Sequence, residues 1–387
     1  MSLNSSKIFF FFSLGLFIIA FILFLISRGG SGYEGNSGKT SIAETGTIGN
    51  MDNGDKWTRC FRYSDGSIFF KDLISRNGGR TLSELKDTLF KEINGAPERA
   101  VLIAGDLFYA LDGPTVFADQ GIYKGKSWRS VDGLKTITQE EPVFYIPDGC
   151  KPRKDIENWY GIYVYRAILK ISDDFWLMTM YGNMEGDTLV PENRDAKKEL
   201  EYMMRTIIVK STDEGKTWYY LSSVAIPAAG EPVGEGFVEP AITKLNDGRL
   251  LCIMRSGHHF PLYSSWSCDT GKTWTPPLYT GFDRGCDPCL ITLNNGRVAL
   301  SWGRRFPEGW SKITPEGDKG LFVYPGEGYT NLSISSDGGY TWETDRIIRN
   351  SGSCYSTIFE VEPDIIFMQS DQWYCRIKVN SGKTKKD

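Results

Sequence analysis

One eight-residue pattern recurs along this chain and constrains its fold more than any other feature. The pattern Ser-x-Asp-x-Gly-x-Thr-Trp occurs without mismatch at Ser211–Trp218, Ser267–Trp274 and Ser335–Trp342. A degenerate fourth copy, GIYKGKSW, ends at Trp128 and has Tyr123 where the aspartate should be. Three perfect copies of a five-residue constraint identify an internal repeat.

The residue types in this pattern are those of a turn between two strands. An aspartate in a turn accepts hydrogen bonds from backbone N–H groups, and glycine permits a positive φ. The threonine and tryptophan that follow favour a return to extended chain, with the ring packed on the sheet. The aspartates are therefore interpreted as turn formers, which take no part in chemistry.

The segments around the copies indicate a β fold built from repeated units. Strand-like runs such as RTIIVKS and YTNLSIS precede the copies, and strand–turn–strand segments such as AITKLNDGRLLCIMRS lie between them. This gives about four short strands in each unit of roughly fifty to seventy residues, a pattern typical of β-propeller blades. We therefore predict an all-β fold, a six-bladed β-propeller spanning residues 51–387.

The N-terminus carries an uncharged apolar run from Ile8 to Ile26, flanked by Lys7 and Arg28. As a helix it would rise about 28 Å, enough to cross the hydrocarbon core of a membrane. No A-x-A-like cleavage site is visible, which favours a signal-anchor in residues 1–28 over a cleaved signal peptide. Residues 29–50 are rich in Gly and Ser and are predicted to form a flexible linker. The predicted domain would then lie outside the cytoplasm, membrane-anchored by a single span or, after cleavage, secreted.

Composition argues against several kinds of partner. The formal net charge is −4, which gives no electrostatic case for nucleic acid. Cys286 and Cys289 have CxxC spacing, but no second pair stands at metal-ligand spacing and the chain has 2 His. A local disulfide or buried thiols are the better interpretations, and we predict no metal and no cofactor.

The repeated pattern, together with EPAITKLNDGRLLCIMRSG, resembles the sialidase (neuraminidase) superfamily of six-bladed propellers. The resemblance is dense from Trp159 to Asp371 and loose over residues 50–158. It implies a site in which three arginines hold a sugar carboxylate, because a planar guanidinium matches a carboxylate bidentately. The first of these arginines and the acid/base map to Arg166 and Asp187 in YRAILKISDDFWLMTMYGNMEGD, although the family commonly has Arg-Ile-Pro where this chain has Arg-Ala-Ile.

The resemblance places the remaining site residues further along the chain. Glu239, which in the family assists a nucleophilic tyrosine, stands sixteen residues before the second arginine, Arg255. The third arginine is assigned to Arg304, with Arg305 as the alternative in ALSWGRRF. The nucleophile maps to Tyr355 in CYSTIFEVEPDIIFMQSD. A neutral tyrosine beside Glu239 as base would avoid the like-charge repulsion between a carboxylate nucleophile and an anionic sugar.

These assignments predict an exo-acting retaining glycosidase for terminal sialic acid or a related acidic sugar on glycoconjugates. Two alternatives stay open at this point. One is a membrane-tethered, non-catalytic propeller that binds glycans, since a fold does not fix function. The other is a glycosidase for a different acidic sugar, which the unusual first arginine segment and the insertion after Arg305 leave possible.

Overall fold

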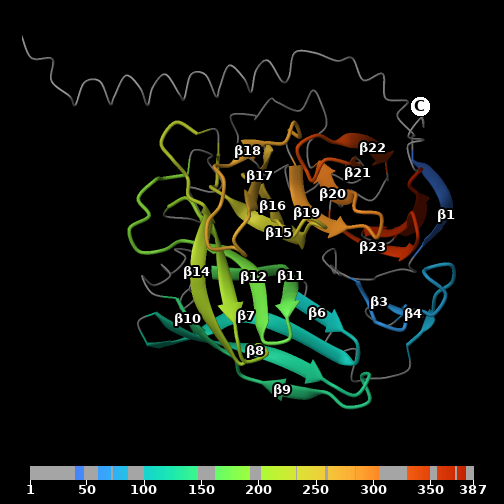
Figure 1. Ribbon diagram of the computed structural model, residues 1–387, viewed down its shortest axis with the longest axis horizontal. Coiled ribbons are helices and arrows are strands. Elements are labelled where there is room, and N and C mark those ends of the chain that lie inside the picture. Colours follow the sequence, from blue (N-terminus) through green and yellow to red (C-terminus); the bar gives the residue numbers. More distant parts are fainter. Residues whose placement is uncertain are drawn as a thin grey trace, which may run out of the picture. The chain divides into compact units, whose positions relative to one another are not determined.

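A computed structural model describes most of the predicted domain. The described residues all fall within one compact unit, Lys39–Asn380. They are residues 40–47, 60–70, 73–85, 100–119, 121–146, 162–191, 202–231, 233–257, 260–283, 285–304, 329–348, 355–370 and 373–380. Every regular element among them is a β-strand, so the prediction of an all-β fold is confirmed (Figure 1).

The largest sheet has nine strands, in the order β10-β14-β13-β12-β11-β6-β7-β8-β9. Because β10 also pairs with β8, eight of these strands close into a ring and β9 extends from its rim. Its strands are β6 (Ala100–Ala104), β7 (Leu107–Asp119), β8 (Ile122–Ser130), β9 (Thr138–Glu140), β10 (Val143–Tyr145), β11 (Ile162–Ser172), β12 (Phe175–Gly182), β13 (Arg205–Ser211) and β14 (Thr217–Ala225).

The other four sheets have four strands each. The first two in chain order contain β2 (Phe61–Arg62), β3 (Ile68–Phe70), β4 (Leu73–Ser75) and β5 (Ser83–Glu84), then β15 (Val238–Lys244), β16 (Leu250–Arg255), β17 (Leu262–Ser267) and β18 (Leu278–Tyr279). The third contains β19 (Gly285–Thr292), β20 (Val298–Arg304), β21 (Tyr329–Ser335) and β22 (Glu343–Ile348). In the last, β1 (Ser41–Thr47) pairs with β25 (Trp373–Lys378), which is followed by β24 (Ile365–Ser370) and β23 (Ser356–Glu362).

The prediction of a six-bladed propeller, with a separate sheet for each blade, is wrong. The described strands form five sheets, because β6–β10 and β11–β14 join into one sheet that closes on itself. The two sets join where β6 pairs in parallel with β11, and the ring closes at β10, which runs parallel to β14 and antiparallel to β8. Two aromatic stacks hold β10 against β14, between Tyr145 and Tyr219 and between Phe144 and Trp218. This junction draws on the N-terminal part of the domain, where the sequence pattern was weakest.

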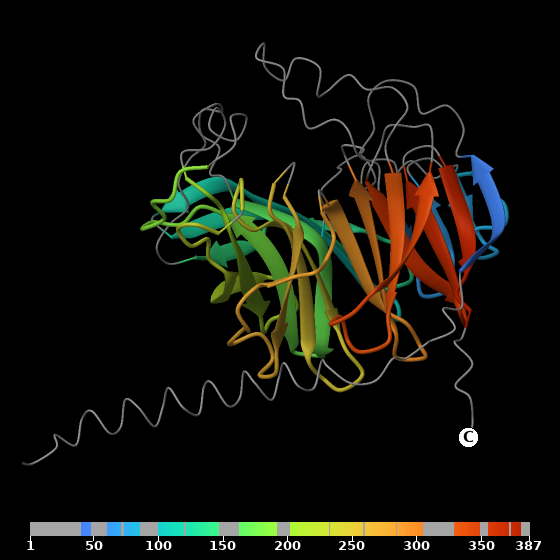
Figure 2. The same cartoon turned by 90° about the horizontal axis from the view of Figure 1, so that it is seen from above.

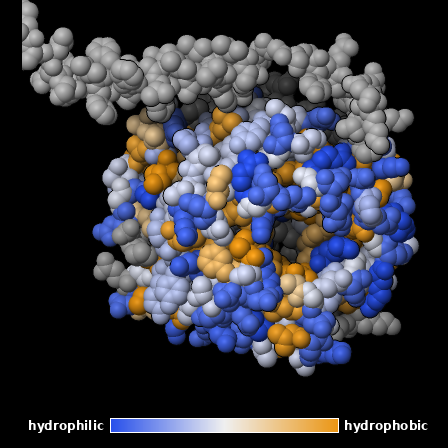
Figure 3. Space-filling view, viewed as in Figure 1, coloured by the Kyte–Doolittle hydropathy of each residue, from blue (hydrophilic) through white to orange (hydrophobic). Residues whose placement is uncertain are grey.

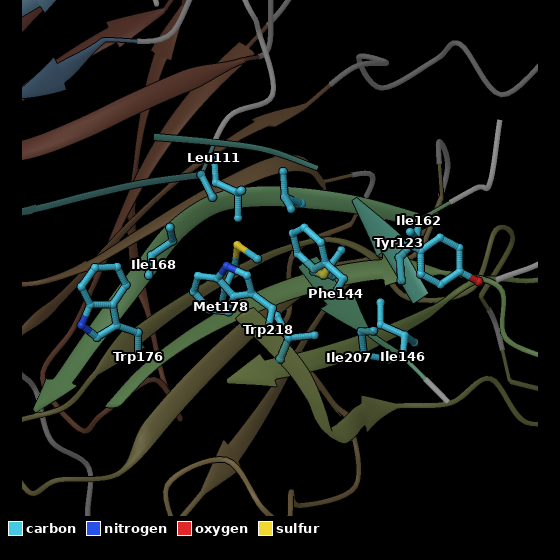
Figure 4. Packing of buried hydrophobic residues seen from close by; sticks show 14 of the residues in the cluster. Leu111, Tyr123, Phe144, Ile146, Ile162, Ile168, Trp176, Met178, Ile207 and Trp218 are labelled. Atoms are coloured by element: carbon cyan, nitrogen blue, oxygen red, sulfur yellow. The ribbon is translucent and has the colours of Figure 1, made fainter. Parts of the chain in front are cut away.

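A cluster of buried apolar side chains from the strands of the closed ring forms its core (Figure 4). Trp176 and Trp218, which lie on β12 and β14, are both buried and anchor this cluster. Phe144 and Tyr123 add rings from β10 and β8. Full burial of a large side chain contributes roughly 1.5–3 kcal/mol, so this cluster is a major source of the sheet's stability.

Neighbouring sheets pack face to face through further apolar clusters. Trp266 and Leu251 of the β15–β18 sheet pack with Leu300 and Trp302 of the β19–β22 sheet. A second cluster joins Leu332 of the β19–β22 sheet to Ile366 of the sheet that holds β23–β25. Figure 2 shows these sheets as adjacent layers.

The repeated pattern forms the same turn at each of its three perfect copies. In the first, Ser211 Oγ donates to Asp213 Oδ1 over 2.8 Å and accepts from the Gly215 N–H at 2.8 Å. Thr217 then donates its N–H and its hydroxyl to the two carboxylate oxygens of Asp213. The copies at Ser267 and Ser335 repeat these bonds. The interpretation of the aspartates as turn formers agrees with this geometry.

Two further copies of this turn escaped the sequence pattern. In the first, Ser130 donates to Asp132, which accepts the N–H and the hydroxyl of Thr136. In the second, Ser75 donates to the Asn77 side-chain oxygen, which also accepts the Thr81 N–H, while the Asn77 NH2 group donates to the Thr81 hydroxyl. The assignment of the degenerate copy to residues 121–128 is wrong, because Ile122–Ser130 is strand β8 and the turn begins only at Ser130. The five turns follow β4, β8, β13, β17 and β21. Each of these is the third strand of a strand group, by which we mean four strands consecutive in the chain: β2–β5, β6–β9, β11–β14, β15–β18 and β19–β22.

The predicted N-terminal segment, residues 1–28, and residues 29–39 and 48–50 of the predicted linker lie outside the described residues. The rest of the predicted linker is described, and within it Ser41–Thr47 is not a loop but strand β1, which pairs with β25. Within the described part of the chain, no helix has the length and apolar character needed to cross a membrane.

The turn at Asp269 predicts a pH-dependent contribution to stability. The Thr273 hydroxyl and backbone N–H donate to this carboxylate and lower its pKa from 3.8 to about 2. A depressed pKa contributes stability that is present above pH 3.8 and is lost as the pH falls through about 2. We expect Asp269→Asn to lose about 1 kcal/mol at pH 6, after allowance for solvent screening, and almost nothing at pH 2.

Urea unfolding of both proteins at the two pH values measures this. Asp174→Asn is the matched control, because Asp174 accepts from Ser172 in an exposed turn outside the repeated pattern. A stability difference for Asp269→Asn that stays constant from pH 6 to pH 2 would contradict the assignment.

Candidate active site

The first strands of three successive strand groups each contain a β-bulge. β11, β15 and β19 each contain a register shift, and a residue with positive φ lies within each shift. These residues are Arg166 (φ 61°), Glu239 (φ 46°) and Asp287 (φ 46°). A left-handed conformation costs a non-glycine residue roughly 1–3 kcal/mol and is concentrated at functional sites. β15 lies against both β11 and β19, and β19 lies against β23, which brings the three bulges together (Figure 1).

The bulges lie at the opposite end of the sheets from the repeated turns. On β16, Leu250 pairs with Ser267, where a turn begins, whereas Arg255 at the far end pairs with Leu262 and Val238. The same register on β20 places Arg304 at the end remote from Ser335. The turns therefore stabilise one end of the sheets and leave the other end for polar side chains. The space-filling view shows a hollow at the centre of the domain, where the first strands converge in Figure 1 (Figure 3).

Glu239 and Arg255 form a buried ion pair. Arg255 Nη1 donates to Glu239 Oε1, and Arg255 Nη2 lies 3.3 Å from Glu235 Oε2. The other oxygen of Glu239 accepts the backbone N–H of Asp287 at 2.8 Å. Glu239 is thus held from two sides, by the end of β16 and by the bulge of β19.

The Arg255 guanidinium lies among several acidic groups. Burial works against its charge, but Glu235, Glu239, Tyr355 and Cys286 outweigh that effect and raise the pKa of Arg255 well above its ordinary value. Tyr355 directly precedes β23 and is half-buried. Tyr355 is connected to Glu239 through the chain, because the N–H of the next residue, Ser356, donates to Asp287, whose own N–H donates to Glu239.

Asp287 organises the neighbouring bulge and is completely buried. Its carboxylate accepts from the Tyr165 hydroxyl and from Arg166 Nη2, both on β11. It also accepts the backbone N–H of Ser356 at 3.1 Å, on β23. Asp287 therefore connects β11, β19 and β23, and the Ser356 bond lies one residue from Tyr355.

Asp187 lies in the loop after β12 and is also buried. Arg205, the first residue of β13, donates to both of its carboxylate oxygens, and the Met184 N–H donates at 2.8 Å. The preceding residue, Met204, forms a backbone bridge with Gly236. A Cβ on Gly236 would lie 2.0 Å from the Met204 carbonyl oxygen, so only glycine permits this close approach of the two backbones. The approach brings Arg205, the partner of Asp187, next to the segment that carries Glu235 and Glu239.

The structure thus gathers most, but not all, of the predicted residues. Glu239, Arg255 and Tyr355 share one cluster, and Arg166 joins it through Asp287. Asp187 pairs with Arg205 on the adjoining segment. The backbone of Arg304 pairs with Gly285 at the end of β20, but its side chain and the whole of Arg305 lie outside the described residues.

Three residues of this site were not predicted: Glu235, Arg205 and Asp287. Asp287 had a readable signal, because CDPCLITLNNGR repeats the layout of VEPAITKLNDGR and places Asp287 where Glu239 stands. Asp287 lies between the two cysteines of the CxxC motif, which drew the interpretation to the thiols and away from the carboxylate. Cys286 and Cys289 are both buried on either side of this bulge. Among the described residues, no His, Cys, Asp or Glu group is arranged to hold a metal ion.

Comparison with known proteins agrees with the resemblance. Residues 177–368 match the family model of the BNR repeat-like domain. Residues 177–368 are therefore similar to a BNR repeat-like domain, which is consistent with the resemblance to the sialidase superfamily. Among proteins with curated descriptions, none matches it significantly by sequence.

Similar solved structures extend the comparison to nearly the whole domain. A protein of unknown function from Dyadobacter fermentans has a TM-score of 0.59 at 16% identity, covering 88% of this chain and 99% of that one. An alpha-L-arabinanase from Penicillium chrysogenum has a TM-score of 0.51 at 12% identity, with 88% and 98% covered. A Hadza microbial sialidase has a TM-score of 0.48 at 15% identity, with 80% and 59% covered. At these identities the first two comparisons show a shared, glycosidase-like fold and nothing more.

The buried pair of Arg205 and Asp187 makes a prediction about stability. Arg205→Ala would leave the Asp187 carboxylate buried without its guanidinium, which costs roughly 3–5 kcal/mol. Arg249→Ala is the matched control, because its partner Asp247 is half exposed and such pairs contribute about 0–1 kcal/mol. Urea unfolding of the two variants measures the difference. Equal losses would show that Asp187 does not depend on Arg205.

Proposed function

We propose that this chain is an exo-acting retaining glycoside hydrolase for terminal sialic acid or a related acidic sugar on glycoconjugates. The observation that supports this most is the buried pair of Glu239 and Arg255, which Asp287 connects to the Ser356 N–H beside Tyr355. A tyrosine phenol in water ionises only near pH 10, so a nucleophilic Tyr355 needs a neighbouring base. Glu239 is the carboxylate that this cluster offers for that role.

In the first step of the proposed reaction, the Tyr355 oxygen attacks the anomeric carbon while Glu239 accepts the phenolic proton. Asp187 must carry a proton for this step, so its ion pair with Arg205 has to open before it gives that proton to the leaving glycosidic oxygen as the bond breaks. In the second step Asp187 takes a proton from water, and the water oxygen displaces Tyr355 from the anomeric carbon. The phenol recovers its proton from Glu239, so the enzyme returns to its starting state.

The arginines would bind the sugar carboxylate. Arg255 is fixed by Glu235 and Glu239, so it can present its guanidinium with little loss of side-chain entropy. Arg166 is likewise held by a carboxylate, that of Asp287. The Arg-Ala-Ile segment at Arg166, where the family commonly has Arg-Ile-Pro, supports a second candidate, a glycosidase for a different acidic sugar whose carboxylate depends less on Arg166.

A non-catalytic glycan-binding role is the remaining alternative. It would use the same pocket residues for binding but would show no turnover of any glycoside. The apolar run of residues 8–26 supports placing this domain outside the cytoplasm, tethered to a membrane or secreted after cleavage. In either case the partners we propose are glycoconjugates that carry acidic sugars.

The proposal predicts that Tyr355→Phe abolishes turnover. Loss of the nucleophilic oxygen should lower kcat by at least about a thousandfold on an aryl α-sialoside, with folding unchanged. Release of the aryl group, followed by absorbance, measures this. Tyr340→Phe is the control, because Tyr340 is exposed and stacks on Trp266 near a repeated turn. Full activity of Tyr355→Phe would refute the role of Tyr355.

A second prediction concerns Arg255→Lys. Lysine keeps the charge but cannot bind the sugar carboxylate bidentately, so we expect kcat/KM to fall about a hundredfold or more. Steady-state kinetics on the aryl α-sialoside and on aryl glycosides of other acidic sugars would measure this. Turnover restricted to one of the other sugars would favour the second candidate, and binding without any turnover would favour the glycan-binding role.

A further inference from the structure

Asp287 has no part in the proposed bond-breaking steps, yet it contacts more of the site than any residue assigned to them. Its carboxylate accepts from Tyr165, Arg166 and the Ser356 N–H, while its own N–H donates to Glu239. These partners come from β11, β15 and β23. One residue thus connects the strand of the proposed base to the strand that follows the proposed nucleophile.

The backbone of Asp287 is what allows both connections. Its φ of 46° lies in the left-handed region, within the register shift between Cys286 and Cys289. A regular strand would use the residue's N–H in the ladder with its neighbour. Here the N–H reaches the Glu239 carboxylate instead, and the side chain of the same residue reaches β11 and β23.

We propose that Asp287 is a positioning residue for the reaction assigned above, setting the distance between Glu239 and Tyr355. This inference rests on the proposed function. The backbone N–H of Asp287 fixes one oxygen of Glu239, and its carboxylate fixes the backbone N–H next to Tyr355. A displacement of either by about 1 Å is enough to slow a reaction that depends on aligned groups.

A carboxylate suits this position better than an amide of the same shape. Both oxygens accept hydrogen bonds, and Arg166 supplies the compensating positive charge. Asparagine would keep the volume but present one NH2 group to these donors and remove the charge that balances Arg166. The Asp287→Asn variant should therefore shift the geometry, and it should also be less stable because Arg166 stays buried without its counter-charge.

The test compares Asp287→Asn with Ser301→Ala. Ser301 is also buried and bonds the Ser356 hydroxyl at 2.9 Å, so its removal disturbs the same residue without touching the Asp287 contacts. We expect Asp287→Asn to lower kcat about 10- to 100-fold with KM changed less than about threefold. Ser301→Ala should keep kcat within about twofold.

Thermal unfolding and a crystal structure of Asp287→Asn complete the test. A folded variant with wild-type kcat, or one whose activity falls only in proportion to its folded fraction, would overturn the positioning role. If the wild-type protein turns over no acidic-sugar glycoside, the proposed function fails. The crystal structure of Asp287→Asn still tests whether Asp287 positions Glu239 and Ser356. Glu239 and Ser356 displaced from their wild-type positions would support it, and unchanged positions would refute it.

Discussion

The structure of the site depends on buried carboxylates and guanidiniums that balance one another. Desolvating an ion costs several kcal/mol, and the cost is recovered only where an opposite charge and further hydrogen bonds are in place. Arg255 with Glu235 and Glu239, and Arg166 with Asp287, meet that condition. Each pair spans two strands or two strand groups, so the same charges that make the site chemically interesting also hold its strands in register.

The repeated turns and the proposed site lie at opposite ends of the sheets. At one end, five turns built on a serine and an aspartate or asparagine close the third strands. At the other, bulges in β11, β15 and β19 turn Arg166, Glu239 and Asp287 toward a common centre. A bulge lets a side chain leave the alternation of its strand, and this is how apolar sheets deliver charged groups inward.

Local patterns in the sequence predicted local structure well. The perfect turns and the all-β class each depend on residues close together in the chain. The joining of two strand groups through β10 was not predictable in this way, because it depends on aromatic stacking between segments far apart in the chain. Arg205 and Glu235 escaped for a similar reason, since nothing near them in sequence marks their partners.

The central claim is that Tyr355 is the nucleophile of a retaining glycosidase. The most direct test is to trap the covalent intermediate with an activated fluorosugar of the sialic acid type and to map the adduct by peptide mass spectrometry. We expect a single adduct on Tyr355, absent from Tyr355→Phe and formed more slowly in Glu239→Gln. An adduct on Glu239 or Asp187, or turnover with no adduct on Tyr355, would contradict it.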